Sequence, residues 1–176
     1  SVLSFLYIFH SVSQWIIAMD LTIATWNINS VRLRIDLVTR FLEEYKPDIL
    51  CLQETKCMNG QFPHGPFRKL GYDHHVINGQ KGYHGVAIIS RLPLQEEESL
   101  VFCNKPDARH GAALVTTPNG PLRIHNFYVP AGGDIPDAEA NEKFAHKLGF
   151  LDEMRQWGQQ EKHSDIPTLR LGDLNV

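Results

Sequence analysis

Polar side chains interrupt the sequence at several points where a β-strand is expected to end. They are Asn27, Glu54, Tyr128, Asp173 and Asn175. Because side chains alternate between the two faces of a strand, Asp173 and Asn175 are expected to point the same way. A single residue of this kind is more often a cap, a turn or a surface group. Only their joint occurrence indicates a functional site.

The chemistry that these residue types could support is hydrolysis of a phosphate ester. Ligands of α/β proteins collect at strand ends. Carboxylate and amide oxygens there suit a hard cation such as Mg²⁺, which takes few protein ligands and keeps several waters. Phosphodiester hydrolysis needs such a cation, a group that orients or deprotonates water, and neutral donors for the phosphate oxygens. The set of carboxylates, amides and phenol provides all three functions.

The first two of these residues follow the strands of an expected strand–helix–strand unit. Segment 21–28 is rich in β-formers and predicts a strand. Apolar residues recur at helical spacing over 31–45, after a helix cap offered by Asn29-Ser30. The apolar run 48–53 predicts a buried strand. Such a crossover usually joins parallel neighbours.

The middle of the chain predicts antiparallel hairpins, because short turn signals such as Asn-Gly separate its strand-like segments. The expected strands span residues 72–77, 85–90, 112–117 and 122–129. A Gly/Pro/Asp-rich loop over 130–136 then precedes a long helix with one apolar stripe. Residues 168–176 predict a last strand that runs into a polar tip. The coarse architecture is a mixed sheet flanked by helices.

Composition limits the class of protein but does not suggest its substrate. With 176 residues, 43% hydrophobic and 21% charged, the chain is typical of one globular domain. The formal net charge of −3 does not indicate a nucleic-acid binder, so a DNA substrate would need a local basic patch or metal ions. The 3 cysteines show neither disulfide nor zinc spacing. We therefore expect a reducing, cytoplasmic location.

The first 18 residues differ from the rest of the chain. They are apolar, lack acidic and basic residues other than His10, and have a polar Ser-Val-Ser-Gln interruption. The basic start of a signal peptide is missing, and the run falls short of the roughly 20 apolar residues that span a membrane. We expect residues 1–18 to be an upstream or non-native extension, with Met19 as the true start. A targeting role is the alternative.

Five short motifs follow one another in an order that resembles one enzyme family. They are Trp-Asn-Ile-Asn-Ser-Val-Arg from residue 26, Leu-Gln-Glu-Thr-Lys from 52, Gly-Tyr-His-Gly-Val-Ala from 82, Tyr-Val-Pro from 128 and Gly-Asp-Leu-Asn from 172. Together they resemble the exonuclease III / abasic-site endonuclease family of the endonuclease/exonuclease/phosphatase superfamily. The stretch 127–157 is similar to bacterial exonuclease III.

The resemblance implies an α/β fold, the deoxyribonuclease I-like four-layer sandwich. Residues 19–176 would be the amino-terminal part of such a domain, truncated after the Gly-Asp-x-Asn motif. The chain would then form the mixed-sheet half, with the carboxyl-terminal sheet missing. An uncovered sheet exposes apolar surface and unpaired edges, so marginal stability is expected.

The resemblance also implies a role for each polar residue at the strand ends. Glu54 resembles the Mg²⁺ ligand, and Asn27 a neighbour that helps to hold the metal and its waters. Asp173 resembles the residue that orients or deprotonates the attacking water, with Asn175 as its partner at the scissile phosphate. Tyr128 matches a phenol that contacts the same phosphate.

Three basic residues are candidates for contact with DNA, although a solvated surface would explain Arg32 and Lys81 equally well. Lys56 follows the glutamate, as in the family, and is expected to set the charge of the site. His84 is assigned no role. The implied cofactor is Mg²⁺, with Mn²⁺ as a substitute. The implied partner is double-stranded DNA with abasic sites or 3′ ends. The full-length protein is expected to be a monomer and not to associate with a membrane.

The family pattern continues beyond the Gly-Asp-x-Asn motif, with a further aspartate and a terminal Ser-Asp-His-like motif. The resemblance therefore predicts a DNA-repair nuclease, active as exonuclease and abasic-site endonuclease, and little activity for the 176 residues alone. One alternative is a phosphatase or sphingomyelinase of the same superfamily, although the first and fourth motifs favour DNA. Another is a non-catalytic fragment. A substrate panel would distinguish the first alternative, and complementation by a separate carboxyl-terminal half the second.

Overall fold

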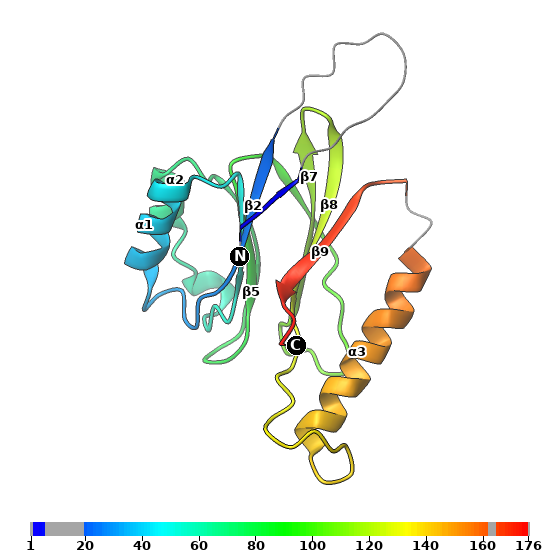
Figure 1. The fold of residues 1–176 in the computed structure, drawn as a ribbon. Helices are drawn as coiled ribbons and strands as arrows, with labels where there is room; N and C mark the ends of the chain where they lie inside the picture. The colour runs from blue at the N-terminus through cyan, green and yellow to red at the C-terminus, as the bar shows by residue number, and fades with distance from the viewer. Residues whose placement is uncertain (1, 6–19, 162–164, 176) are drawn as a thin grey trace.

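The computed structural model describes residues 2–5, 20–161 and 165–175, which form two β-sheets and the helices around them (Figure 1). The elements in chain order are β1 (Val2–Phe5), β2 (Leu21–Asn27), α1 (Ile35–Tyr45), β3 (Ile49–Gln53), the 3₁₀ turn η1 (Asn59–Gln61), α2 (His64–Lys69), β4 (His74–Asn78), β5 (Val86–Ser90), β6 (Leu94–Glu97), β7 (His110–Thr117), β8 (Gly120–Tyr128), α3 (Glu142–Gln160) and β9 (Thr168–Asp173).

The first sheet has the strand order β1-β2-β3-β5-β4. Strands β2 and β3 run parallel, with Asn27 opposite Gln53, and α1 makes the crossover between them. Strand β5 pairs antiparallel with both β3 and β4. Every residue of β3 is buried, which agrees with its continuous apolar run. The predicted strand–helix–strand unit is therefore confirmed.

The second sheet has the order β6-β7-β8-β9. Strands β7 and β8 form an antiparallel hairpin in which Thr117 lies opposite Gly120, and β9 pairs parallel with β8 after the α3 crossover. Our expectation that a second sheet is missing is not confirmed, because these four strands already form one. The local patterns predicted most of the strands correctly but could not show that the two hairpin regions belong to different sheets.

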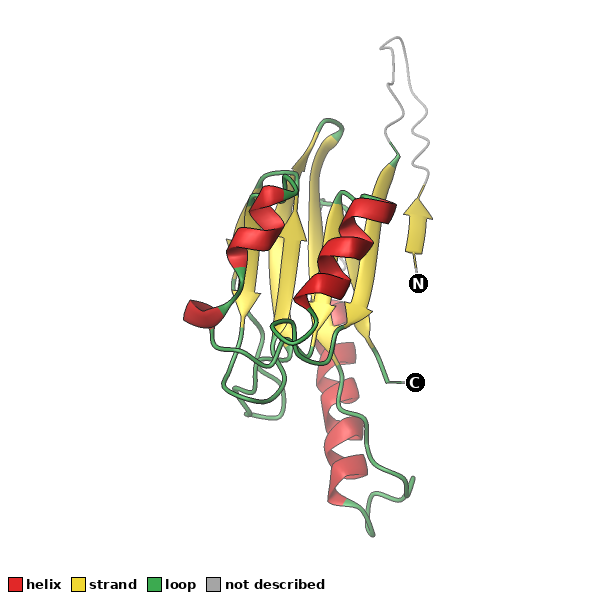
Figure 2. Cartoon of the chain, turned by 90° about the vertical axis from the view of Figure 1, so that its left-hand side faces the viewer, coloured by secondary structure: helices red, strands yellow, loops and turns green. Residues whose placement is uncertain are grey.

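The elements stack in four layers, with a hydrophobic cluster between each pair of layers (Figures 1 and 2). Helices α1 and α2 pack on the outer face of the first sheet, where Val38, Leu42 and Phe67 are buried. The two sheets face each other through residues such as Ile88 and Ile124. Helix α3 covers the other face of the second sheet. The expected four-layer α/β sandwich is thus confirmed.

The first helix begins later than the sequence predicts. Helix α1 starts at Ile35, and its N-cap residue Arg34 makes no capping bond through its side chain. The Ser30 amide instead donates to the Glu54 carbonyl at 2.7 Å, and the Val31 amide donates to the Thr55 carbonyl at 3.1 Å. Residues 28–31 therefore continue the pairing with the β3 segment. The predicted cap at Asn29-Ser30 was wrong for this reason.

A buried polar bridge connects the two sheets. The Gln53 side chain on β3 donates to Asn126 Oδ1 on β8 at 2.7 Å. Asn126 Nδ2 donates to the backbone carbonyls of Leu52 and Ala87, each at 3.0 Å. Both side chains are almost fully buried. Because an unpaired buried amide is costly, this bridge favours one alignment of the sheets over others.

Two buried histidines, His110 on β7 and His125 on β8, pack against α3. The Leu100 amide donates to His110 Nδ1 at 2.8 Å, so the proton of the neutral ring must be on Nε2. His110 Nε2 therefore donates a hydrogen bond to His125 Nδ1, which lies 3.0 Å away. His125 Nε2 has no hydrogen-bonding partner and packs in a cluster with Trp157. Burial lowers the pKa of His110 to about 3 and that of His125 to about 4.

The histidine pair is expected to make the fold sensitive to acid. In the unfolded chain both histidines have a pKa of about 6.5, so below this pH the unfolded chain binds two protons. The folded chain binds them only at much lower pH, because burial lowers both pKa values. Stability is therefore lost as pH falls, from about 6.5 down toward 4 and 3. We expect a loss on the order of 3 kcal/mol between pH 6.5 and pH 5 from the pair. Urea unfolding at several pH values measures it.

The matched variant for this prediction is His110→Asn, which keeps an acceptor for the Leu100 amide but removes one titrating ring. It should be less stable than the wild type at neutral pH, because it loses the bond to His125. Its further loss of stability on acidification should be about half as large. An unchanged dependence on pH would show that this pair does not carry the effect.

Most of residues 1–18 lie outside the described residues, so their predicted origin stays a prediction. Residues 2–5 form β1, which pairs antiparallel with β2 at the edge of the first sheet.

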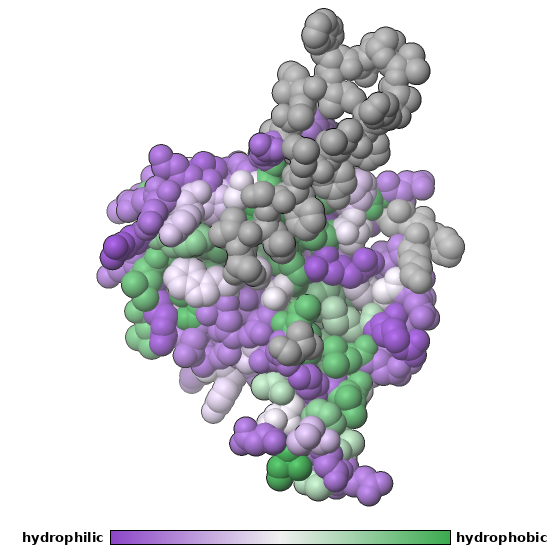
Figure 3. Space-filling view, viewed as in Figure 1, coloured by the Kyte–Doolittle hydropathy of each residue, from purple (hydrophilic) through white to green (hydrophobic). Residues whose placement is uncertain are grey.

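Within the described part of the chain, none of the helices has the length and apolar character needed to cross a membrane. On the face seen in Figure 3, hydrophobic residues gather between β9, an edge strand, and α3.

Candidate active site

The polar residues singled out in the sequence come together where strands of both sheets end. Asn27 is the last residue of β2, and Glu54 directly follows β3 in the first sheet. Tyr128 and Asp173 are opposite each other at the ends of the parallel strands β8 and β9 in the second sheet. The site therefore lies across the junction of the two sheets, and each sheet supplies one carboxylate.

The Asn27 side chain connects the two carboxylates. Its Nδ2 donates to Glu54 Oε1 at 2.8 Å and to Asp173 Oδ2 at 2.7 Å. Its Oδ1 accepts from the Asn29 amide at 3.1 Å, which fixes the orientation of the side-chain amide. Both hydrogens of the NH₂ group are thus directed at carboxylate oxygens. Asn27 holds Glu54 and Asp173 close together without cancelling their charge.

Glu54 receives hydrogen bonds from three side chains. Besides Asn27, the Tyr128 hydroxyl donates to Oε1 at 2.9 Å, and Lys56 Nζ lies 2.9 Å from Oε2. Burial by itself would raise the pKa of Glu54, but the three hydrogen bonds and the Lys56 charge outweigh it, so the pKa lies below its ordinary value. Burial and the bond to Glu54 raise the pKa of Tyr128 to about 12. At neutral pH the carboxylate is charged and the phenol is a hydrogen-bond donor.

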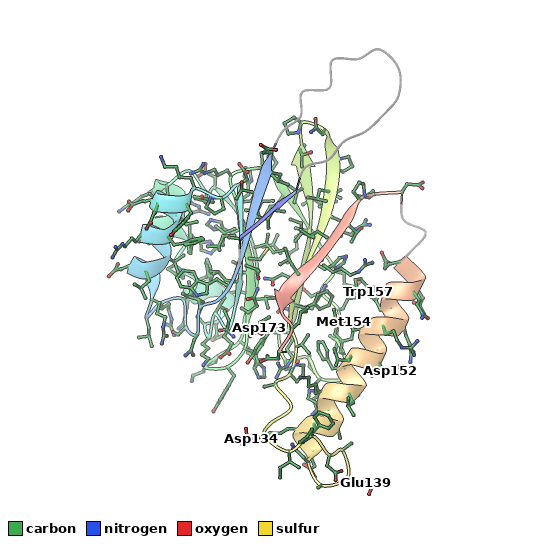
Figure 4. The ribbon with its side chains drawn as sticks, viewed as in Figure 1. Asp134, Glu139, Asp152, Met154, Trp157 and Asp173 are labelled. Atoms are coloured by element: carbon green, nitrogen blue, oxygen red, sulfur yellow. The ribbon has the colours of Figure 1, made fainter. Side chains whose placement is uncertain are left out.

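Asp173 is the last residue of β9, and Asn175 follows the strand with a φ of +50°, so the strand alternation on which we based their common direction does not extend to Asn175. The Asn175 amide donates to Asp173 Oδ1 at 3.2 Å. The Asn175 side chain donates to the Val129 carbonyl at 2.8 Å, which ties the tip of β9 to the end of β8. In Figure 4, Asp173 lies beside the junction of the sheets, whereas Asp152 lies on α3, away from it. Asp173 is thus held through both of its carboxylate oxygens.

The backbone at the site adopts a conformation that is unusual for residues other than glycine. Glu54 and Lys56 have φ values of +52° and +51°. Hydrogen bonds on both sides hold this segment: Ser30 donates to the Glu54 carbonyl, and the Lys56 amide donates to the His84 carbonyl at 2.9 Å. Such strain costs on the order of 1–3 kcal/mol per residue and is typical of functional sites. The loops around residues 30 and 84 therefore position Glu54.

The donor set of the site suits a hard divalent cation. Glu54 and Asp173 offer carboxylate oxygens, and Asn27 lies between them. Within the described residues there is no cluster of three or more His, Cys, Asp or Glu side chains that could hold a metal. A cation here would have few protein ligands, all oxygen, and would keep several waters. That is the coordination that Mg²⁺ prefers.

The three basic residues that we expected to touch DNA differ in position. Lys56 lies in the site, where Nζ contacts Glu54 and donates to Asn29 Oδ1. Arg32 is exposed, and its guanidinium donates to the Gln61 side chain at 3.3 Å. Lys81 is exposed in the turn between β4 and β5. Geometry thus places Lys56 with the carboxylates and leaves Arg32 and Lys81 outside this group.

Sequence reasoning missed Arg109 and His84, which lie against Tyr128. The Arg109 guanidinium is 4.8 Å from the Tyr128 ring centroid, and Nη1 donates to the Tyr128 carbonyl at 3.2 Å. The His84 ring contacts Tyr128 at a centroid distance of 5.7 Å. Neither residue lies in a pattern with ligand spacing. Only the pairing of β7 with β8, which starts beside Arg109, reveals the contact.

Comparison with known proteins gives consistent matches over nearly the whole chain. Residues 24–176 match the model of the endonuclease/exonuclease/phosphatase family. Exodeoxyribonuclease III of Haemophilus influenzae is 31% identical over 159 residues, which cover 86% of this chain and 56% of that protein. Among solved structures, an AP endonuclease from Archaeoglobus fulgidus superposes with a TM-score of 0.74 at 37% identity, covering 89% of this chain and 58% of that one.

A second solved structure also has the same fold and a similar sequence. A variant of the 3′ phosphatase NExo from Neisseria, bound to a product DNA hairpin, has a TM-score of 0.76 and 32% identity, and the match covers 88% of this chain and 57% of that one. The chain thus spans somewhat more than half the length of the relatives it matches. The motif order, the four-layer fold and the family match agree, and the chain belongs to the endonuclease/exonuclease/phosphatase family.

Proposed function

We propose that the protein that carries this chain hydrolyses phosphodiester bonds of DNA, with incision beside abasic sites and removal of nucleotides from 3′ ends. The observation that carries this proposal is the pair Glu54 and Asp173, joined by the Asn27 amide and flanked by the Tyr128 phenol. The names of the relatives, an exodeoxyribonuclease III and an AP endonuclease, support DNA as the substrate. We also propose that residues 19–176 are the amino-terminal part of the catalytic domain.

Each residue of the site has a role that follows from its charge and its neighbours. Asp173 orients the attacking water and accepts its proton, since Asn27 and the Asn175 amide fix both carboxylate oxygens. Tyr128, protonated at neutral pH, donates a hydrogen bond to a non-bridging phosphate oxygen. Asn175 contacts the same phosphate. Lys56, Arg32 and Lys81 contact the DNA backbone, Lys56 nearest to the reacting group.

The cofactor that fits this donor set is Mg²⁺, for which Mn²⁺ can substitute. Glu54 would hold it through its carboxylate, and Asn27, whose NH₂ group points at Glu54 and whose Oδ1 accepts from the Asn29 amide, would help to hold the metal through its waters. When bound, it supplies positive charge to the phosphate oxygens and the leaving group. Hydrogen bonds keep Glu54 ionised to a lower pH than usual, which preserves a charged ligand in mildly acidic solution.

The test is a panel of three substrates: an abasic-site DNA duplex, an inositol polyphosphate and sphingomyelin. Each is incubated with the full-length protein that carries this chain, in Mg²⁺, in Mn²⁺ and in excess chelator. We expect cleavage of the abasic strand in either metal and none in chelator. Cleavage of sphingomyelin or release of phosphate from the inositol compound, with intact DNA, would assign the other branch of the family. Cleavage of DNA that continues in chelator would refute the metal-assisted mechanism.

A further inference from the structure

His84 occupies the space between Arg109 and Asp107, beside the ring of Tyr128. It lies in the loop between β4 and β5, and its φ is +47°. Its Nε2 is 3.0 Å from Arg109 Nη2, and its Nδ1 is 3.0 Å from the Asp107 carbonyl. Its ring centroid is 5.7 Å from that of Tyr128. His84 is thus connected by side-chain contacts to a residue that reaches the site.

The partners of His84 determine which of its nitrogens carries the proton. An arginine guanidinium can only donate, so Nε2 must accept from Arg109. A backbone carbonyl can only accept, so Nδ1 must carry the proton and donate to Asp107. The Gln80 side-chain amide also lies 3.2 Å from Nδ1, and with Nδ1 protonated that amide must be turned so that its oxygen faces the ring. A neutral ring satisfies both bonds at once, whereas a doubly protonated ring would place an N–H against the guanidinium. Burial and the Arg109 charge also lower the pKa of His84, which favours the neutral ring.

The hydrogen bond that His84 accepts completes the set of contacts that holds Arg109. Nε of Arg109 donates to Asp107 Oδ2 at 2.6 Å, Nη1 donates to the Tyr128 carbonyl, and Nη2 donates to His84. Each of the three guanidinium nitrogens therefore has an acceptor, and the plane of the group is fixed over the Tyr128 ring. Without His84, Nη2 would lose this acceptor, and the guanidinium would be held by two hydrogen bonds instead of three.

We propose that His84 is a positioning residue: its neutral ring holds the Arg109 guanidinium against Tyr128 and thereby aims the Tyr128 hydroxyl at Glu54 and the reacting phosphate. The inference rests on the proposed function, because it assigns Tyr128 to that reaction. His84 and Arg109 need not touch the substrate. Their contribution is the orientation of the phenol, which a packed ring and a bound backbone carbonyl both restrict.

Two variants of His84 separate positioning from a merely structural role. In His84→Gln the side-chain oxygen can reach the position of Nε2 and accept from Arg109. In His84→Asn the shorter side chain reaches only the position of Nδ1 and loses Arg109. The backbone preference runs the other way, because asparagine tolerates a positive φ better than glutamine does. A structural role predicts that Asn is the better replacement, and positioning predicts that Gln is.

The first measurement is steady-state cleavage of abasic DNA by the protein with Mg²⁺. We expect kcat of His84→Gln to lie within about threefold of the wild type, and kcat of His84→Asn to fall on the order of tenfold at unchanged KM. Equal kcat values for the two variants, or a higher value for His84→Asn, would overturn the proposal, as would a change confined to KM.

The second measurement does not depend on activity and keeps the two proposals distinguishable. Nitrogen-15 NMR of the His84 ring at pH 7.5 should show an unprotonated Nε2 and a protonated Nδ1. The Arg109 side-chain protons should show the ring-current shift of Tyr128 in the wild type and in His84→Gln, and should lose it in His84→Asn. A protonated Nε2, or an unchanged shift in His84→Asn, refutes positioning by His84. Failure of the wild type to cleave DNA, with these NMR signatures present, refutes only the proposed function.

Discussion

The variant Asp173→Asn is expected to cleave abasic DNA about 10²- to 10⁴-fold more slowly than the wild type, the range typical for loss of a positioned general base. The substitution preserves the shape of the side chain, and the amide oxygen can still accept from Asn27. It removes the negative charge and the capacity to take a proton from water. The fall should therefore appear in kcat in single-turnover and steady-state assays, with little change in DNA affinity.

The control is Asp152→Asn, which removes a carboxylate of the same type from the outer surface of α3. The Asp152 side chain is 54% exposed and pairs with Arg155, away from the site (Figure 4). Its cleavage rate should equal that of the wild type. Similar losses in both variants would point to overall charge rather than to a base at position 173, and a fully active Asp173→Asn would remove Asp173 from the mechanism.

The variant Gly172→Ala is expected to lose about 3 kcal/mol or more of stability and most of its activity. Gly172 has a φ of +140°, and a β-carbon added there would lie 1.9 Å from the carbonyl oxygen of Phe127 and 2.7 Å from its nitrogen. Both obstacles are backbone atoms of the neighbouring strand β8, so no side chain can rotate away. The tip of β9 must move, and Asp173 moves with it. The midpoint of urea unfolding and the cleavage rate measure the two effects.

Gly158→Ala is the matched control for this prediction. Gly158 lies in α3, and a β-carbon there would meet no atom within 4 Å. Alanine is the better helix former by about 1 kcal/mol, so this variant should be slightly more stable than the wild type. The same substitution is thus expected to lower the stability at position 172 and to raise it at position 158. If Gly172→Ala changed stability and cleavage rate only slightly, β8 and β9 would be able to move apart without displacing Asp173 from the site.

Much of the fold could be predicted from the sequence, because its strands and helices have clear local patterns. The richness of residues 21–28 in β-formers, the helical spacing after it and the buried run 48–53 correctly predicted β2, α1 and β3 with a parallel pairing. The start of α1 could not be predicted, since the bonds from Ser30 and Val31 go to residues about 24 positions away. Local propensity does not include contacts of that range.

The division into two sheets was beyond local patterns for a related reason. Strands β5 and β7 are both apolar and both belong to hairpins, so nothing in either segment indicates its sheet. The choice is made by side chains such as Asn126, which bonds to β3 and β5 across the interface. A buried asparagine in a strand signals such a bond, but its partner cannot be identified from the sequence.

The residue types of the candidate site were predictable, and their connections were not. Polar residues at strand ends pointed to Glu54, Tyr128 and Asp173, and the structure brings these together. The bridge made by Asn27 depends on where the two sheets meet. His84 lies in the third motif and Arg109 in none, and the contacts of these two residues with each other and with Tyr128 could not be read from the sequence.

The location of the two carboxylates on different sheets has a consequence for how the protein responds to heat and pressure. Glu54 belongs to the first sheet and Asp173 to the second, and one amide spans the boundary between them. Any sliding of one sheet over the other would break this connection while leaving the hydrogen bonds within each sheet intact. Catalytic competence would then be lost before circular dichroism registers any unfolding. In the proposed nuclease, turnover is therefore the most sensitive reporter of shear between the two sheets.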